Sequence, residues 1–128
     1  MSTRILIVDD SAAVRSAVRA CLQLNPGLDL CGEAENGQTA VELVRRLAPD
    51  IVLLDYHMPV LDGLEAAQEI ARIAPGTTIF LFTMSASEEL YRFAATIGIH
   101  AVVSKGAGGV EEIVRLIANL HRDLDSTA

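Results

Sequence analysis

Five short apolar segments recur along the chain, and a stretch with helical periodicity follows each of them. Three of these segments are almost continuously apolar instead of alternating between apolar and polar residues. This pattern is typical of strands that are covered on both faces, as in parallel sheets. The predicted strands are 4–8, 28–34, 51–54, 78–82 and 101–104.

Between the predicted strands, apolar residues recur at the i, i+3, i+4, i+7 spacing of amphipathic helices. In the fourth such stretch Leu90 and Phe93 share one face, and we expect one of Tyr91 and Phe93 to be exposed and the other to lie in the core. Ser85 and Glu88 have the spacing of a capping box that opens this helix. Proline and glycine residues predict where the helices end.

Five alternations of strand and helix predict an α/β fold, the flavodoxin-like (βα)5 doubly wound sandwich. Right-handed crossovers then favour a five-stranded parallel sheet in the order 2-1-3-4-5. The 128 residues fit a single domain, 1–128, with a core over about 4–120 and a polar tail at 121–128.

Composition excludes several classes of function. A formal net charge of −7 disfavours direct binding to nucleic acid, which needs clustered Lys and Arg. No apolar run is long enough to span a membrane, and the N-terminal residues lack the pattern of a signal peptide, so we expect a cytoplasmic protein. Cys21 and Cys31 lack a CxxC spacing and are expected to be reduced and largely buried.

Polar residues follow four of the five predicted strands. They are Asp9 and Asp10 after the first, Asp55 after the third, Thr83 after the fourth and Lys105 after the fifth. The carboxyl ends of parallel strands meet at one edge of the sheet, and open α/β sheets bind ligands there, where the strand order reverses. The reversal falls between strands 1 and 3, which carry the three aspartates.

The grouping of these residues suggests phosphoryl chemistry. Three neighbouring carboxylates repel one another unless a cation neutralises them, and ligands that are all oxygen favour Mg²⁺. An aspartate can attack a phosphoryl group, while a lysine and a hydroxyl stabilise the phosphoryl oxygens. Each residue alone also has a structural interpretation: Asp10 or Ser11 as a helix N-cap, and Lys105 as a solvated side chain. Their combination favours a site.

These motifs together resemble the receiver domains of two-component response regulators, the CheY-like family, over about 4–120. The motifs are VDDS at 8–11, LLDYHMPVLDG at 53–63, FT at 82–83 and VSK at 103–105. The stretch CGEAENG at 31–37 further resembles receivers that carry a LuxR-type DNA-binding domain.

The resemblance implies that Asp55 is the phosphoacceptor, which takes its phosphoryl group from a sensor histidine kinase. It also implies a Mg²⁺ ion held by the carboxylates of Asp10 and Asp55. The backbone carbonyl of His57 would complete the protein ligands, and Asp9 would support the ion mainly through water.

The resemblance also assigns the remaining site residues and the partners. Thr83 and Lys105 would contact the phosphoryl oxygens, and Pro59 and Gly63 would shape the loop after the third strand. A C-terminal LuxR-type output domain or a separate effector would receive the signal, and phosphorylation could promote a homodimer. The receiver itself would be a switch that assists its own phosphorylation and dephosphorylation, and not an enzyme.

The chain departs from the family pattern at three positions. Val102 stands where the family often has a switching aromatic residue, so Thr83 and its loop would carry the signal alone. Gly106 replaces a frequent proline, which predicts a more permissive loop. Met84 is bulkier than the small residues that are common there, which predicts either narrower access for the phosphodonor or packing against its loop; we favour packing.

Two other functions are consistent with parts of the pattern. The departures at Val102 and Gly106 would suit a receiver-fold interaction module with little or no phosphorylation. An aspartate-nucleophile phosphatase needs a second acid two residues after the nucleophile, and this chain has His57 there. The sequence thus favours the phosphorylated switch over both alternatives.

Overall fold

Residues 2–58 and 60–126 are described by the computed structural model, with side chains up to residue 123. Within these residues, five strands form one parallel sheet in the order β2-β1-β3-β4-β5. The flavodoxin-like topology predicted from the sequence is therefore confirmed. The strands are β1 (Thr3–Val8), β2 (Leu28–Ala34), β3 (Ile51–Leu54), β4 (Thr78–Thr83) and β5 (Ala101–Ser104).

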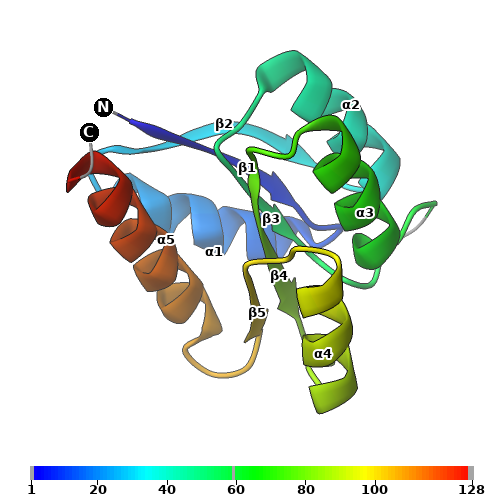
Figure 1. Cartoon of the computed structure of the whole chain (residues 1–128). Helices are drawn as coiled ribbons and strands as arrows, with labels where there is room; N and C mark the ends of the chain where they lie inside the picture. The colour runs from blue at the N-terminus through cyan, green and yellow to red at the C-terminus, as the bar shows by residue number, and fades with distance from the viewer. Residues whose placement is uncertain (1, 59, 127–128) are drawn as a thin grey trace.

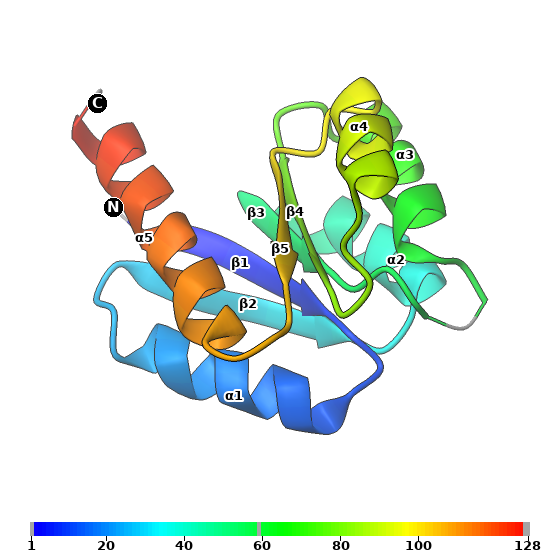
Figure 2. The same ribbon diagram turned by 90° about the horizontal axis from the view of Figure 1, so that it is seen from below.

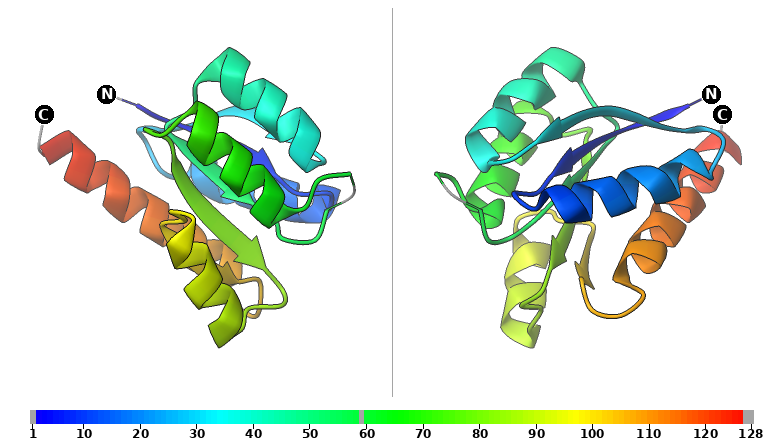
Figure 3. Two further views of the ribbon diagram at one scale, coloured as in Figure 1. Left: turned by 45° about the vertical axis from the view of Figure 1, so that its right-hand side comes forward. Right: turned by 180° about the vertical axis from the view of Figure 1, so that it is seen from behind.

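A helix follows each strand and covers one face of the sheet (Figure 1). Seen from below, α1 and α5 lie on one face, and α2, α3 and α4 lie on the other (Figure 2). The two further views agree with this division (Figure 3). The helices are α1 (Ala12–Gln23), α2 (Gly37–Leu47), α3 (Gly63–Ile73), α4 (Glu88–Thr96) and α5 (Gly109–Ser126).

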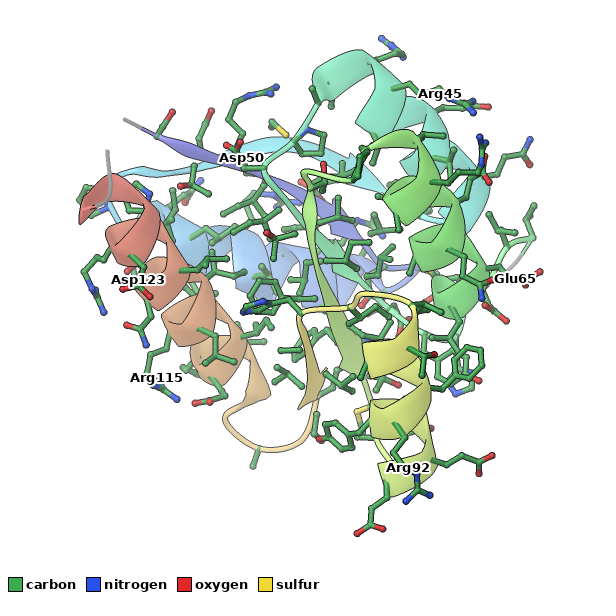
Figure 4. All side chains as sticks on the ribbon, in the orientation of Figure 1. Arg45, Asp50, Glu65, Arg92, Arg115 and Asp123 are labelled. Atoms are coloured by element: carbon green, nitrogen blue, oxygen red, sulfur yellow. The ribbon has the colours of Figure 1, made fainter. Side chains whose placement is uncertain are left out.

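Two apolar cores lie between the sheet and the helices, because adjacent strand residues point to opposite faces. Leu6 and Val8 pack beneath α2 and α3, in the same cluster as Ala40 and Ile70. Ile5 and Ile7 contribute instead to the second cluster, beneath α1 and α5. Both faces of β1 are thus buried, which explains its continuously apolar sequence. Charged residues such as Arg92 and Arg115 project from the outer surfaces of the helices (Figure 4).

The register of the central strands aligns their ends. Val8 pairs with Leu54, and Leu54 pairs with Leu81. The residues that come next, Asp9 and Asp55, therefore emerge side by side at the carboxyl edge of the sheet. The fold thereby places the predicted site residues on neighbouring strand ends.

Two local predictions about helices are wrong. The N-cap of α4 is Ser87, whose hydroxyl oxygen accepts a hydrogen bond from the Leu90 amide at 3.1 Å, and not Ser85. Tyr91 and Phe93 are each 46% exposed, so neither lies in the core. The α5 helix continues to Ser126, into the segment 121–128 that was predicted to be a polar tail. Residues 127–128 lie outside the described part.

Other expectations can be compared directly with the described residues. Cys21 and Cys31 are both free and half-buried. None of the described helices combines the length and the apolar character that crossing a membrane requires.

Candidate functional site

Three aspartates converge at the carboxyl ends of β1 and β3. The Asp9 amide donates to Ala34 O at 3.0 Å, and the Asp55 amide donates to Val8 O at 2.9 Å, so the sheet hydrogen bonds continue into both residues. Asp9, Asp10 and Asp55 each offer a carboxylate oxygen within 4.8 Å of the others. Asp9 and Asp55 are buried, whereas Asp10 is exposed.

Lys105 joins this group from the end of β5. Its amide donates to Thr83 O at 2.9 Å, which fixes the backbone next to β4. Its Nζ lies 2.6 Å from Asp9 Oδ2 and 3.2 Å from Asp55 Oδ1, and 5.8 Å from the centre of the Phe82 ring. The side chain is only 9% exposed, so Lys105 is a buried ion-pair partner and not a solvated lysine.

The electrostatics of the cluster suit a bound cation. Burial raises the pKa of Asp55, and the nearby Asp9 carboxylate raises it further, while Lys105 opposes both effects. One ammonium cannot neutralise three carboxylates, so a net negative charge remains at this edge. The donor atoms are all oxygens, and the exposure of Asp10 leaves room for water ligands, as a hard divalent ion such as Mg²⁺ requires.

Hydroxyl groups at the site have defined partners. Thr83 is fully buried at the end of β4, and its Oγ1 accepts a hydrogen bond from the Ser85 amide at 3.1 Å. Ser11 is the N-cap of α1, with its Oγ accepting from the Val14 amide at 3.2 Å. The capping interpretation therefore applies to Ser11 and leaves the Asp10 carboxylate available.

Position 63 requires glycine, because its backbone lies too close to the backbone of Asp55 for a side chain to fit. Its amide donates to Tyr56 O at 2.8 Å, and a Cβ added at Gly63 would lie 2.3 Å from Asp55 O. Asp62 and Glu65 form a capping box there that opens α3. Gly63 thus lets the loop return against the residue that carries the central carboxylate. Pro59, the other loop residue named from the sequence, lies outside the described residues.

The sequence matches the response regulator receiver domain family over residues 5–118. The chain belongs to this family. It is therefore a receiver domain of two-component signal transduction, and its fold agrees with that assignment.

Relatives of this receiver include proteins with different names. A Methanosarcina acetivorans protein named "Protein-glutamate methylesterase/protein-glutamine glutaminase 1" is 38% identical over 92% of this chain and 36% of its own. "Response regulator GacA" of Pseudomonas aeruginosa is 33% identical over 89% of this chain and 53% of its own. The receiver thus spans between about a third and about half of the length of these two relatives.

The same fold is found in a solved structure that is similar to this chain in sequence. The crystal structure of a two-component response regulator of the LuxR family from Aurantimonas superposes with a TM-score of 0.87 and 29% identity. The match covers 96% of this chain and 87% of that chain. The likeness extends over nearly the whole receiver.

The structure shows the burial and the contacts of the positions that depart from the family pattern. Val102 is half-buried and packs against the core beneath α4. Met84 is 70% exposed, so the expectation that it packs against its loop is wrong. The Gly106 amide donates to Ser104 Oγ at 3.2 Å. The exposed His57 ring stacks on Tyr56, with 4.6 Å between the ring centroids.

One residue next to the acidic cluster was missed by the sequence reasoning. Arg15, in the second turn of α1, donates a hydrogen bond from Nη1 to Asp9 O at 2.6 Å. The available signal was the pair Arg15 and Arg19, four residues apart on one helix, facing the acidic residues of β2. That signal indicates a salt bridge, and nothing in it points to Asp9.

Proposed function

We propose that Asp55 accepts a phosphoryl group from the phosphohistidine of a sensor histidine kinase in the cytoplasm, in a Mg²⁺-dependent reaction. The observation that carries the proposal is the position of Lys105 Nζ, within ion-pair distance of the two buried carboxylates of Asp9 and Asp55. The carboxylates of Asp10 and Asp55 and the carbonyl of His57 would hold the ion, and Asp9 would support it through water.

The residues of the site account for the transfer. A carboxylate oxygen of Asp55 forms a bond to phosphorus as the phosphorus–nitrogen bond of phosphohistidine breaks, and the electron pair returns to the imidazole. Lys105, already 3.2 Å from Asp55 Oδ1, pairs with the phosphoryl oxygens. Bound Mg²⁺ neutralises charge on the carboxylates and the phosphoryl group. Asp55 is consumed in each transfer, so this chain acts as a switch that assists its own phosphorylation and dephosphorylation.

Thr83 would convert the phosphoryl charge into a change of shape. Its Oγ1 accepts a hydrogen bond from the Ser85 amide, and we expect the hydroxyl to turn toward a phosphoryl oxygen and donate to it. The loop that opens α4 would then rearrange, which shifts an equilibrium between two states. Because Val102 replaces the aromatic residue, the signal would leave through this loop and reach the face formed by α4, β5 and α5.

The domain or effector that receives the signal is the second part of the proposal. CGEAENG at 31–37 and the likeness to a LuxR-family regulator support a C-terminal LuxR-type DNA-binding output domain, and a separate effector is the alternative. The net charge of −7 argues against contact between DNA and the receiver itself. A homodimer formed on phosphorylation would bring two output domains together.

Incubation with acetyl phosphate and Mg²⁺ tests the proposal by mass spectrometry. We expect one phosphoryl adduct on the wild-type chain, none on Asp55→Asn, and a strongly reduced yield for Asp10→Asn at limiting Mg²⁺. An adduct that persists at full level in Asp55→Asn would contradict the assignment. If the folded wild-type chain forms no adduct, a receiver-fold interaction module becomes the better interpretation.

A further inference from the structure

Arg15 holds the peptide group that joins the two aspartates of β1. Its Nη1 donates to the carbonyl of Asp9, which belongs to the peptide bond between Asp9 and Asp10. The Arg15 side chain is 13% exposed, although it lies on the second turn of a surface helix. The guanidinium thus reaches the acidic edge from α1 without touching a carboxylate of the cluster.

Asp9 is held at each of its other polar groups as well. Its amide is bonded to Ala34 O, its Oδ1 accepts from the Ser11 amide at 2.9 Å, and its Oδ2 pairs with Lys105. Asp10 therefore lies between two fixed peptide groups, one held by Arg15 and the other by Asp9 Oδ1. No side chain in the described part of the chain holds the Asp10 carboxylate by a hydrogen bond or ion pair. Its direction depends on the backbone.

Arg15 is itself anchored by Glu33 of β2 and by Glu35, which lies just after this strand. Its Nε donates to Glu33 Oε1 at 3.2 Å, and its Nη2 lies 3.6 Å from Glu35 Oε1. Arg19 also holds Glu33, through hydrogen bonds of 2.9 Å, and this contact lowers the pKa of Glu33. Glu33 is therefore ionised at neutral pH, and the planar guanidinium of Arg15 has a fixed orientation.

We infer that Arg15 is a positioning residue for the metal site: it orients the Asp9–Asp10 peptide so that the Asp10 carboxylate points toward the cation. The inference rests on the proposed function, because the cation is the Mg²⁺ of that reaction. Simple electrostatics predicts the opposite effect, since a positive guanidinium near the site repels Mg²⁺. If removal of Arg15 weakens Mg²⁺ binding, the residue acts by positioning; if removal strengthens binding, it acts mainly through its positive charge.

Titration calorimetry with Mg²⁺ alone tests the inference on four chains: wild type, Arg15→Gln, Arg19→Gln and Asp10→Asn. Arg19 is the matched control, because it binds the same Glu33 from the next turn and does not contact Asp9. We expect Arg15→Gln to weaken Mg²⁺ binding about tenfold, as the loss of a residue that orients metal ligands usually does. Arg19→Gln should stay within about twofold of wild type, while Asp10→Asn should lose most of the binding.

Phosphorylation by acetyl phosphate supplies a second measurement. In Arg15→Gln, the Mg²⁺ concentration at half-maximal rate should rise by the same factor as the dissociation constant, and the rate at saturating Mg²⁺ should change little. Urea unfolding of both arginine variants checks that they are folded. If Arg15→Gln does not fold, Arg15→Lys is measured instead, because it keeps the charge but loses the fork of donors, and the same direction is expected.

The outcomes are distinguishable. Equal or tighter Mg²⁺ binding by Arg15→Gln would overturn the inference, as would an equal weakening in Arg19→Gln, which would indicate a general loosening of α1 against β2. Failure of the wild-type chain to bind Mg²⁺ would instead contradict the proposed function itself.

Discussion

At the scale of single residues, the site depends on side chains and backbone groups in close contact with Asp55. Lys105 pairs with Asp55 and Asp9 and is almost completely removed from water, so its attraction to them is screened less than that of a surface pair. Because Gly63 has no side chain, the loop after β3 can pack directly against the Asp55 carbonyl. Small changes at these contacts should therefore have large effects.

Replacement of Gly63 by alanine tests this packing. The added Cβ would lie 2.3 Å from Asp55 O, so the backbone must move, and we expect a loss of about 2–4 kcal/mol in the free energy of unfolding. Gly76→Ala is the control, because no atom lies within 4 Å of a Cβ there, and it should change stability by less than about 0.5 kcal/mol. Urea denaturation measures both, and equal stabilities would contradict the close approach.

At the scale of elements, the start of α4 matters because only a short loop separates it from Thr83 along the chain. The segment between them contains two serines with different roles. Ser85 uses its backbone amide to bond Thr83, and Ser87 uses its side chain to cap the helix. A rearrangement of Thr83 would therefore act first on Ser85, and the cap at Ser87 would keep the helix intact while its entry loop moves.

Alanine substitutions distinguish these roles. Ser87→Ala removes the acceptor for the Leu90 amide, and we expect a loss of about 1 kcal/mol in the free energy of unfolding. Ser85→Ala keeps its backbone amide and should cost less than about 0.5 kcal/mol. Thermal and urea unfolding give the comparison. A larger loss in Ser85→Ala would place the N-cap where the sequence pattern suggested it.

At the scale of the whole molecule, the fold concentrates acidic charge at one edge of its sheet. Burial and repulsion by Asp9 raise the pKa of Asp55, so folding disfavours its ionised form. When folding raises the pKa of an acid, the native state loses stability as pH rises from the pKa of the unfolded chain through the raised pKa of the folded chain, and the loss persists above it. In the absence of a cation, the assembled acidic site therefore lowers the free energy of unfolding of the receiver.

Asp55→Asn should therefore be more stable than wild type at neutral pH without Mg²⁺, by on the order of 1 kcal/mol. The difference should shrink as pH falls and should vanish below the ordinary Asp value of 3.8, where the wild-type carboxyl is protonated in both states. Saturating Mg²⁺ should reduce the difference or reverse it, because the ion stabilises only a folded chain that binds it. Urea unfolding across pH, with and without Mg²⁺, checks the sign. A less stable Asp55→Asn at neutral pH would contradict this account.

The sequence alone determined the strands, their order and the edge at which the polar residues gather. Its apolar periodicity is local, and a parallel sheet with right-handed crossovers then leaves few topologies. The predicted strands agree with the structure to within one residue at each end. Asp9, Asp10 and Asp55 were predicted to converge because the first two follow the first strand and Asp55 follows the third, and they do.

The tertiary structure decided the contacts that depend on side-chain direction and on packing between distant segments. The pairing of Lys105 with both Asp9 and Asp55 joins three strand ends, and no local pattern specifies its distances. The reach of Arg15 to the Asp9 carbonyl depends on how α1 lies against β2. The cap at Ser87 and the exposure of Phe93 depend on where α4 meets the sheet, because capping propensity at Ser85 and Ser87 is the same.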